Sequence, residues 1–124
     1  MRLRTLPDLY AIVRLDPDAA VPEWVYDSPF WSVTRSDAEL SVVCAEEDLP
    51  DDTRAERGWS ALELLGPLDF SLTGVVASLV SPLADAKVPI FVISTFETDY
   101  LLVRESDSVR AVAALREAGH VVDA

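Results

Sequence analysis

Three residues in the second half of the chain have chemistry suited to binding a zwitterion. Gly74 stands where a helix is expected to begin, and the backbone N–H groups of residues 72–75 could donate to a carboxylate. A glycine there also lets a ligand approach the main chain closely. Asp99 can accept a charge-assisted hydrogen bond from an ammonium or guanidinium group, and Phe96 could enclose an aliphatic portion. These residue types suit an amino acid as the ligand.

Each of these residues also has a purely structural interpretation. Gly74 could permit close packing of a helix on a sheet, and Asp99 could open an exposed strand beside a turn. Phe96 could be a partly exposed aromatic residue of that turn, while Thr95 could form hydrogen bonds within it. The residues alone therefore leave ligand binding and structural roles open.

Other reactive residue types give weaker signals. His120 is the only histidine, and no nucleophilic residue lies at a recognisable catalytic spacing from it in the sequence. We therefore expect His120 to lie at the surface and not to act as a catalytic base. Cys44 lies in an apolar run and is expected to be an inert core thiol. The acidic residues between 46 and 52 lack the spacing and turn glycine of a calcium loop. We therefore expect no enzyme activity, no metal site and no cofactor.

The composition of the chain bounds its partners. The 124 residues include 22 acidic and 10 basic side chains, which gives a net charge of −12. Such a field repels nucleic acid and anionic membrane surfaces. A single cysteine cannot form an internal disulfide, and the sequence predicts neither a signal peptide nor a membrane span. We therefore expect a cytoplasmic protein.

Hydrophobic periodicity in the second half predicts the order strand, helix, strand, strand, helix, strand. The strands are expected at residues 59–65, 89–94, 99–104 and 121–122, with helices at 72–83 and between residue 108 and Gly119. The order is typical of an α+β, ferredoxin-like βαββαβ fold, an antiparallel sheet with both helices on one face. This domain is assigned to residues 58–124.

Several details of these elements are also predicted. Ser71 or Thr73 is expected to cap the first helix, in which Pro82 should kink the helix or weaken one backbone bond to Ser78. The continuous apolar run at 89–94 predicts a buried strand. The second helix is expected to turn one side inward, formed by Val109, Val112 and Ala113.

The first half resembles a shortened copy of the second. A strand is expected at residues 9–13, within the stretch 7–15, and a hairpin at 30–34 and 40–44. A shift of 60 residues places this hairpin on the later one, with Val33 on Ile93 and Glu39 on Asp99. An internal duplication explains the match, so residues 1–57 are assigned to a truncated unit of the same kind.

Two stretches of the second half carry a family resemblance. Gly66-Pro-Leu-Asp-Phe-Ser-Leu-Thr-Gly74 and Ser94-Thr-Phe-Glu-Thr-Asp-Tyr-Leu-Leu-Val103 resemble bacterial ACT-domain proteins related to the CASTOR arginine sensors. The resemblance covers about residues 59–123 and, more faintly, 8–45. It implies a non-enzymatic, allosteric regulatory module that binds an amino acid at the interface between ACT units. The ligand-binding residues it implies are Gly74, Thr95, Phe96 and Asp99.

The partners follow from the same resemblance and from the size of the chain. A homodimer that continues the sheet is expected, because so small a protein leaves sheet edges to be covered. Any regulatory output would then pass through an unidentified protein partner or an oligomeric change. The alternative is a ligand-free module in which the fold only mediates interaction and oligomerisation.

Overall fold

The computed structural model describes residues 1–66 and 73–124. These residues form two compact units. We call Met1–Pro7 together with Ser60–Ala124 the helical unit, and Asp8–Trp59 the hairpin unit. The first seven residues therefore pack with the second half of the chain. The boundary expected between residues 57 and 58 divides the sequence into two related units, and it stays a prediction.

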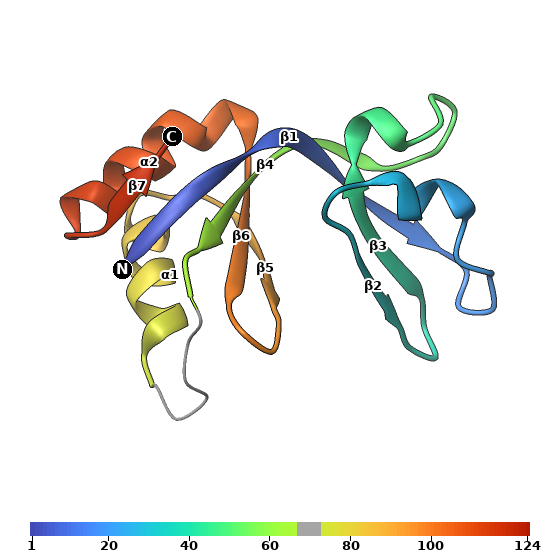
Figure 1. Ribbon diagram of the computed structural model, residues 1–124, viewed down its shortest axis with the longest axis horizontal. Helices are drawn as coiled ribbons and strands as arrows, with labels where there is room; N and C mark the ends of the chain where they lie inside the picture. Colours follow the sequence, from blue (N-terminus) through green and yellow to red (C-terminus); the bar gives the residue numbers. More distant parts are fainter. Residues whose placement is uncertain (67–72) are drawn as a thin grey trace. The chain divides into compact units, whose positions relative to one another are not determined.

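The helical unit contains the predicted βαββαβ order (Figure 1). Its elements are β4 (Glu56–Leu64, which begins in the hairpin unit), α1 (Val75–Asp85), β5 (Ile90–Ser94), β6 (Asp99–Arg104), α2 (Ser108–Glu117) and β7 (Val121–Asp123). Neighbouring strands follow the order β7-β1-β4-β6-β5. The α+β, ferredoxin-like class is therefore confirmed.

Strand β1 (Arg2–Leu15) begins earlier than the sequence predicted, and its first part adds a strand to this sheet. Its first residues pair with β7 in parallel, from Arg2 opposite Val121 to Arg4 opposite Asp123. The expected strand began only at residue 9, because the three residues that pair with β7 are too short a signal. The insertion gives the helical unit a parallel pair within an otherwise ferredoxin-like sheet.

Both helices cover the same face of this sheet, which we call the helix face. Alternate residues of a strand point to the same side, so Leu62 and Leu64 of β4 share a face with Leu101 and Val103 of β6. One apolar cluster joins these strand residues to Leu3, Val122, Leu79 and Leu83 of α1, and Ala111 and Leu115 of α2. The predicted placement of both helices on one face is confirmed.

Helix α1 differs from the expectation at its start. It begins at Val75 behind Gly74, whose φ of 74° and ψ of 4° place it in the left-handed region as the N-cap residue. Thr73 is therefore not the cap, while the alternative cap Ser71 lies outside the described residues, as does Leu72. Pro82 does lie inside the helix, as predicted.

Two predictions about which side chains are buried were wrong. Strand β5 is only half-buried because it lies at the edge of the sheet, so its continuous apolar run does not mark a central strand. In α2 the buried side chains are Ala111 and Leu115, whereas Val109 is 84% exposed and Ala113 is exposed. Val112 is half-buried at the border between these two sides.

The hairpin unit has its own small core. Strands β2 (Ser32–Arg35) and β3 (Leu40–Ala45) form the predicted hairpin, and β3 pairs with the second part of β1 in antiparallel fashion. Two 3-10 helices, η1 (Glu23–Asp27) and η2 (Glu46–Asp48), stand where a full unit would carry longer helices. The core side chains are Ala11, Val13, Val25, Leu40, Val42, Cys44 and Leu49.

The two hairpins have the same register, but at a different shift from the one predicted. Arg35 pairs with Leu40 next to the first turn, and Ser94 pairs with Asp99 next to the second. A shift of 59 residues, not 60, superimposes these pairs, together with the turn bonds from Ser36 N to Glu39 O and from Thr95 N to Thr98 O. The counterpart of Asp99 is therefore Leu40 and not Glu39. This one-residue difference matters because neighbouring residues of a strand point to opposite faces of the sheet.

Candidate functional site

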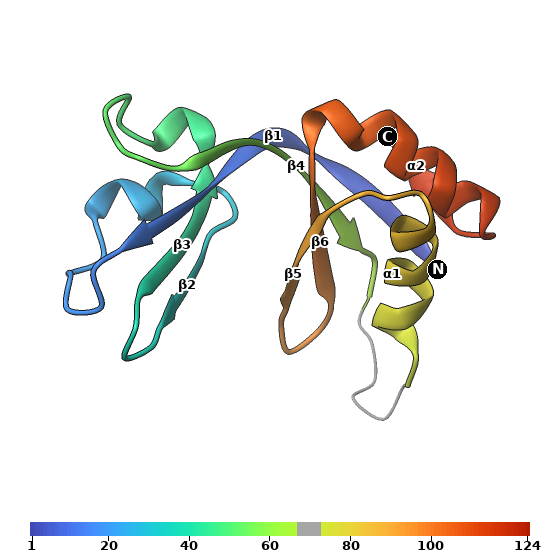
Figure 2. The same cartoon turned by 180° about the vertical axis from the view of Figure 1, so that it is seen from behind.

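A pocket of about 350 Å³ lies where β4 ends and β5 turns into β6; we call it the turn pocket. It is lined by residues 63–66, residues 95–98 and Tyr100. Figures 1 and 2 show that the start of α1 lies at the same end of the helical unit as the turn between β5 and β6. The volume of the turn pocket falls within the range of small-molecule sites in proteins.

The carboxylate of Glu63 is the most firmly held acidic group of the turn pocket. Its Oε1 accepts a hydrogen bond of 2.7 Å from Arg4 Nε, and its Oε2 accepts one of 2.9 Å from the Tyr100 hydroxyl. All three residues occupy positions on the face opposite the helix face, because Arg4 follows Leu3 and Tyr100 precedes Leu101. A carboxylate has about four lone-pair sites, so Glu63 keeps acceptor capacity for a ligand.

Tyr100 is held in its protonated form. Partial burial raises the pKa of the Tyr100 hydroxyl above its ordinary value of 10.0, and the hydrogen bond to Glu63 and the charge of that carboxylate raise it further. The nearby Arg4 guanidinium acts in the opposite direction. The phenol therefore stays a donor that orients the Glu63 carboxylate.

The turn between β5 and β6 is closed by its two threonines. Thr95 N donates to Thr98 O over 2.8 Å, and Thr98 N donates to Thr95 Oγ1 over 3.2 Å. Thr98 Oγ1 donates to Leu64 O and so fastens the turn to the end of β4. Thr95 therefore both forms turn bonds and lines the pocket, and Phe96, which is 78% exposed, lines it beside Thr95.

Asp99 and Gly74 are not among the residues that line the turn pocket. Asp99 is only 8% exposed, shares its strand side with Leu101, and accepts a hydrogen bond of 2.5 Å from Ser94 Oγ across the hairpin. At Gly74, an added Cβ would meet no heavy atom of the described residues within 4 Å. Of the four residues expected to bind a ligand, the structure brings Thr95 and Phe96 together.

Sequence reasoning missed Glu63, Thr98 and Tyr100. The alternation within β4 does give a signal, because Glu63 is a charged residue between the apolar Leu62 and Leu64. Its partner could not be found in the same way, since β4 and β6 are neighbours in the sheet but not in the sequence. Only the register between these strands brings Tyr100 to Glu63.

The remaining reactive residues have structural surroundings. Cys44 is fully buried, and its burial, with a smaller effect from the charge of Asp48, raises the pKa of its thiol to about 11 against an opposing effect of Arg57. Within residues 1–66 and 73–124, no cluster of three or more histidine, cysteine, aspartate or glutamate side chains could hold a metal ion. None of the helices in the described part of the chain is long and apolar enough to cross a membrane.

Comparisons with known proteins extend these observations. A family model described as an ACT domain matches residues 54–117, more than half of the chain, and a second model, described as an N-terminal domain, matches residues 8–52. The human protein CASTOR3P is 31% identical over 91 residues, which cover 63% of this chain and 56% of that protein. The bovine protein named cytosolic arginine sensor for mTORC1 subunit 1 is 30% identical over 89 residues. This match covers 63% of the chain but only 27% of the bovine protein.

Solved structures share the fold. The protein Atu0741 from Agrobacterium tumefaciens is 42% identical with a TM-score of 0.92, over 98% of this chain and 90% of that one. The regulatory subunit of aspartate kinase from Thermus thermophilus is 12% identical with a TM-score of 0.62, over 90% of this chain and 93% of that one. At 12% identity, the similarity to the aspartate kinase subunit shows a shared fold alone. The chain belongs to the ACT-domain family and is related to the CASTOR proteins.

Proposed function

We propose that this protein is a non-enzymatic regulatory module that binds an amino acid at the end of its helical unit, where α1 begins and β5 turns into β6. The observation that carries the proposal is the Glu63 carboxylate, which Arg4 and Tyr100 hold at the wall of a pocket of about 350 Å³. The family supports a regulatory, small-ligand-binding role.

The ammonium group of the ligand is proposed to bind the acidic side of the turn pocket. Glu63 offers a fixed acceptor, and Glu97 adds a second, exposed carboxylate at the same pocket. A charge-assisted bond from an ammonium to a held carboxylate is stronger than one between neutral groups. The acidic lining also suits a basic side chain, and the bovine relative is named an arginine sensor. Phe96 would cover the aliphatic part of the ligand.

The carboxylate of the ligand is proposed to bind the start of α1. Helix N-termini present unpaired N–H groups and a partial positive charge, which favour an anion. Gly74 precedes this helix start, and an added Cβ there would meet no heavy atom of the described residues within 4 Å, which supports an approach of the ligand to the main chain. In this proposal Asp99 and Thr95 complete the ligand contacts from β6 and its turn.

A homodimer is proposed to form through β5. This strand ends the sheet of the helical unit, and its residues 90–93 are apolar and half-buried. An exposed apolar edge strand is a template for pairing with another strand. A ligand that prefers one arrangement of the subunits would shift the population of that arrangement, which is how a module without catalysis can regulate.

A thermal-shift screen of the protein against the twenty amino acids tests the proposal. A ligand at a hundredfold excess over its dissociation constant stabilises the folded state by about 2.7 kcal/mol. The proposal predicts at least one amino acid that raises the melting temperature by several degrees. A folded protein that none of them stabilises would instead favour the ligand-free oligomerisation module.

A further inference from the structure

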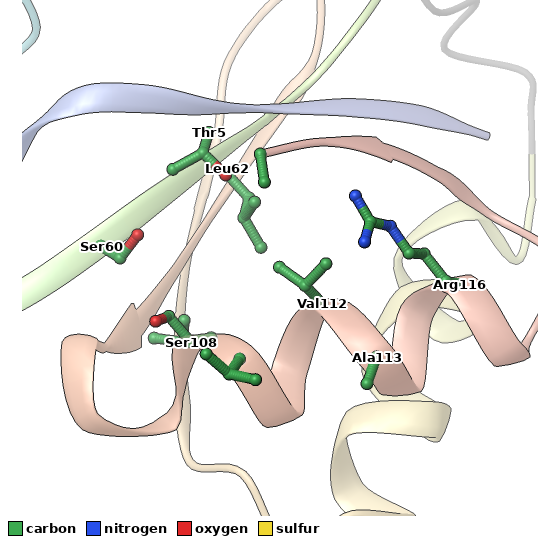
Figure 3. A pocket seen from close by; sticks show the side chains of 10 residues that line it. Thr5, Ser60, Leu62, Ser108, Val112, Ala113 and Arg116 are labelled. Carbon is green, nitrogen blue, oxygen red and sulfur yellow. The ribbon is translucent and has the colours of Figure 1, made fainter.

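A second pocket, of about 380 Å³, lies between α2 and the strands of the helical unit; we call it the α2 pocket (Figure 3). Its lining comprises Thr5, Ser60, Leu62, Val103, Ser108, Val109, Val112, Ala113, Arg116 and Ala124. None of these residues lines the turn pocket, so the two pockets are separate.

One side of α2 forms the wall of this pocket. Residues 109, 112, 113 and 116 are spaced by three and four and therefore share one side of the helix. Val109 and Ala113 are exposed, whereas Val112 is half-buried and packs against the core. Leu62 and Val103 form the facing apolar wall on the sheet.

Ser60 and Arg116 are polar groups at the two ends of the α2 pocket, and Thr5 and Ser108 line it as well. Figure 3 shows Ser60 on β4 at one end and Arg116 at the other, with Leu62 and Val112 between them. Ser60 is only 8% exposed, and its hydroxyl makes no hydrogen bond within the described residues. The Ser60 oxygen is not one of the buried atoms that lack a partner, so it is open to the pocket and can donate to or accept from a polar group of a ligand.

Arg116 supplies the charge at the opposite end. Its Nη2 donates to Val122 O over 2.7 Å, which holds the guanidinium beside the middle of β7 and leaves further N–H donors for a ligand. It is the only charged side chain among the residues that line the pocket in the described part of the chain. A fixed guanidinium beside apolar walls favours a carboxylate with a hydrocarbon chain.

We propose that the α2 pocket is a second ligand site, for an aliphatic carboxylate that carries a hydroxyl or similar polar group at its far end. The carboxylate pairs with Arg116, the hydrocarbon chain lies against Leu62 and Val112, and the far polar group bonds to Ser60. The distance along α2 from residue 108 to residue 116 is about 12 Å, which accommodates a chain of several carbons. The site is independent of the amino acid site proposed above.

Titration of the full chain with three matched probes, followed by NMR chemical shifts, tests this site. 6-Hydroxyhexanoate carries both polar ends, hexanoate lacks the hydroxyl, and 1,6-hexanediol lacks the carboxylate. We expect saturable shifts at Leu62 and Val112 with 6-hydroxyhexanoate, and affinities at least about tenfold weaker for 1,6-hexanediol. Hexanoate should bind with intermediate affinity. Because the protein has a net charge of −12, unspecific binding of an anion is disfavoured.

Substitutions separate the two ends of the pocket. Ser60→Ala should remove the preference for 6-hydroxyhexanoate over hexanoate without lowering the melting temperature, since its hydroxyl has no partner to lose. Arg116→Gln should weaken both carboxylates at least about tenfold, whereas Arg110→Gln, on the same helix but outside the pocket, should not.

Three results would overturn the proposal. One is the absence of saturable binding by 6-hydroxyhexanoate to a folded protein. Another is an affinity for 1,6-hexanediol equal to that for 6-hydroxyhexanoate, which would show that Arg116 does not bind the carboxylate. The third is a set of shifts confined to the turn pocket and abolished by Phe96→Ala. A failure here leaves the amino acid screen unaffected, because Ser60 and Arg116 do not line the turn pocket.

Discussion

His120 Nε2 lies 3.0 Å from the carbonyl oxygen of Ser78, in the middle of α1. In an uninterrupted helix that carbonyl would accept from the N–H of the residue four positions later, which here is Pro82. Proline has no N–H, so its position in α1 leaves the Ser78 carbonyl without its helical partner. Because a carbonyl can only accept, His120 must donate from Nε2, and it replaces the missing backbone bond. The single histidine of the chain thus has a structural role.

This relationship predicts coupling between two substitutions. His120→Ala should destabilise the protein by about 1–2 kcal/mol, because it leaves a carbonyl of α1 without a partner. Pro82→Ala restores the backbone N–H, so in that background His120→Ala should cost distinctly less. Urea unfolding of the wild type, both single variants and the double variant measures the coupling free energy. Equal costs of His120→Ala in the two backgrounds would show that the histidine does not replace the helical bond.

The contact between Tyr100 and Glu63 predicts a dependence of stability on alkaline pH. Since the pKa of Tyr100 is raised in the folded protein, folding favours the protonated phenol. Its contribution to stability is complete below the unfolded pKa of about 10 and is lost as the pH rises through the higher folded value. Tyr100→Phe should therefore lower stability at neutral pH by about 1 kcal/mol and flatten its decline at alkaline pH.

Tyr26→Phe is the matched control for this measurement. Tyr26 is exposed, and its hydroxyl makes no hydrogen bond within the described residues. Both variants retain Cys44, so its titration cancels in the comparison. If the two variants show the same stability between neutral and alkaline pH, the Tyr100–Glu63 bond contributes nothing and the proposed orientation of Glu63 loses its support.

The left-handed backbone of Gly74 predicts a strain that depends on residue type. Gly74→Ala should destabilise the protein by about 1 kcal/mol, and Gly74→Asn by less, because asparagine tolerates a positive φ better than alanine. An added Cβ meets no heavy atom of residues 1–66 and 73–124 within 4 Å, so the expected cost comes from the backbone. Denaturant unfolding compares the variants. A cost-free Gly74→Ala would mean that this glycine is not held in the left-handed region.

The order of elements in the second half could be predicted because it depends on local patterns. Strand β6 begins at Asp99 and ends at Arg104 as expected, since a short turn and an apolar run define a hairpin without distant partners. The left-handed Gly119 after α2 was predicted for the same reason, with an observed φ of 98°.

Burial could not be predicted where two interpretations fit one pattern. The spacing of α2 allows an inward side with Val109 and Ala113 or one with Ala111 and Leu115, and only contact with the sheet selects the second. The first residues of β1 become a strand because β7, at the other end of the chain, pairs with them. In each case the deciding partner is remote in sequence.

The candidate site was predictable in part. Thr95 and Phe96 were found through the family resemblance, and both line the turn pocket. Glu63 and Tyr100 depend on the neighbourhood of β4 and β6, which no local pattern reveals. The match of the two hairpins was one residue off because both turns are short and their sequences differ, which obscures the register.

The most direct test of amino acid binding is the thermal-shift screen carried out on matched variants. We expect one or a few amino acids to raise the melting temperature of the wild type by several degrees at saturating concentration. Glu63→Gln and Asp99→Asn should each reduce or abolish that shift. Glu117→Gln, which removes the same charge from an exposed position on α2, should preserve it. A flat screen with folded protein, or a shift that survives both Glu63→Gln and Asp99→Asn, would contradict an amino acid site at this end of the helical unit.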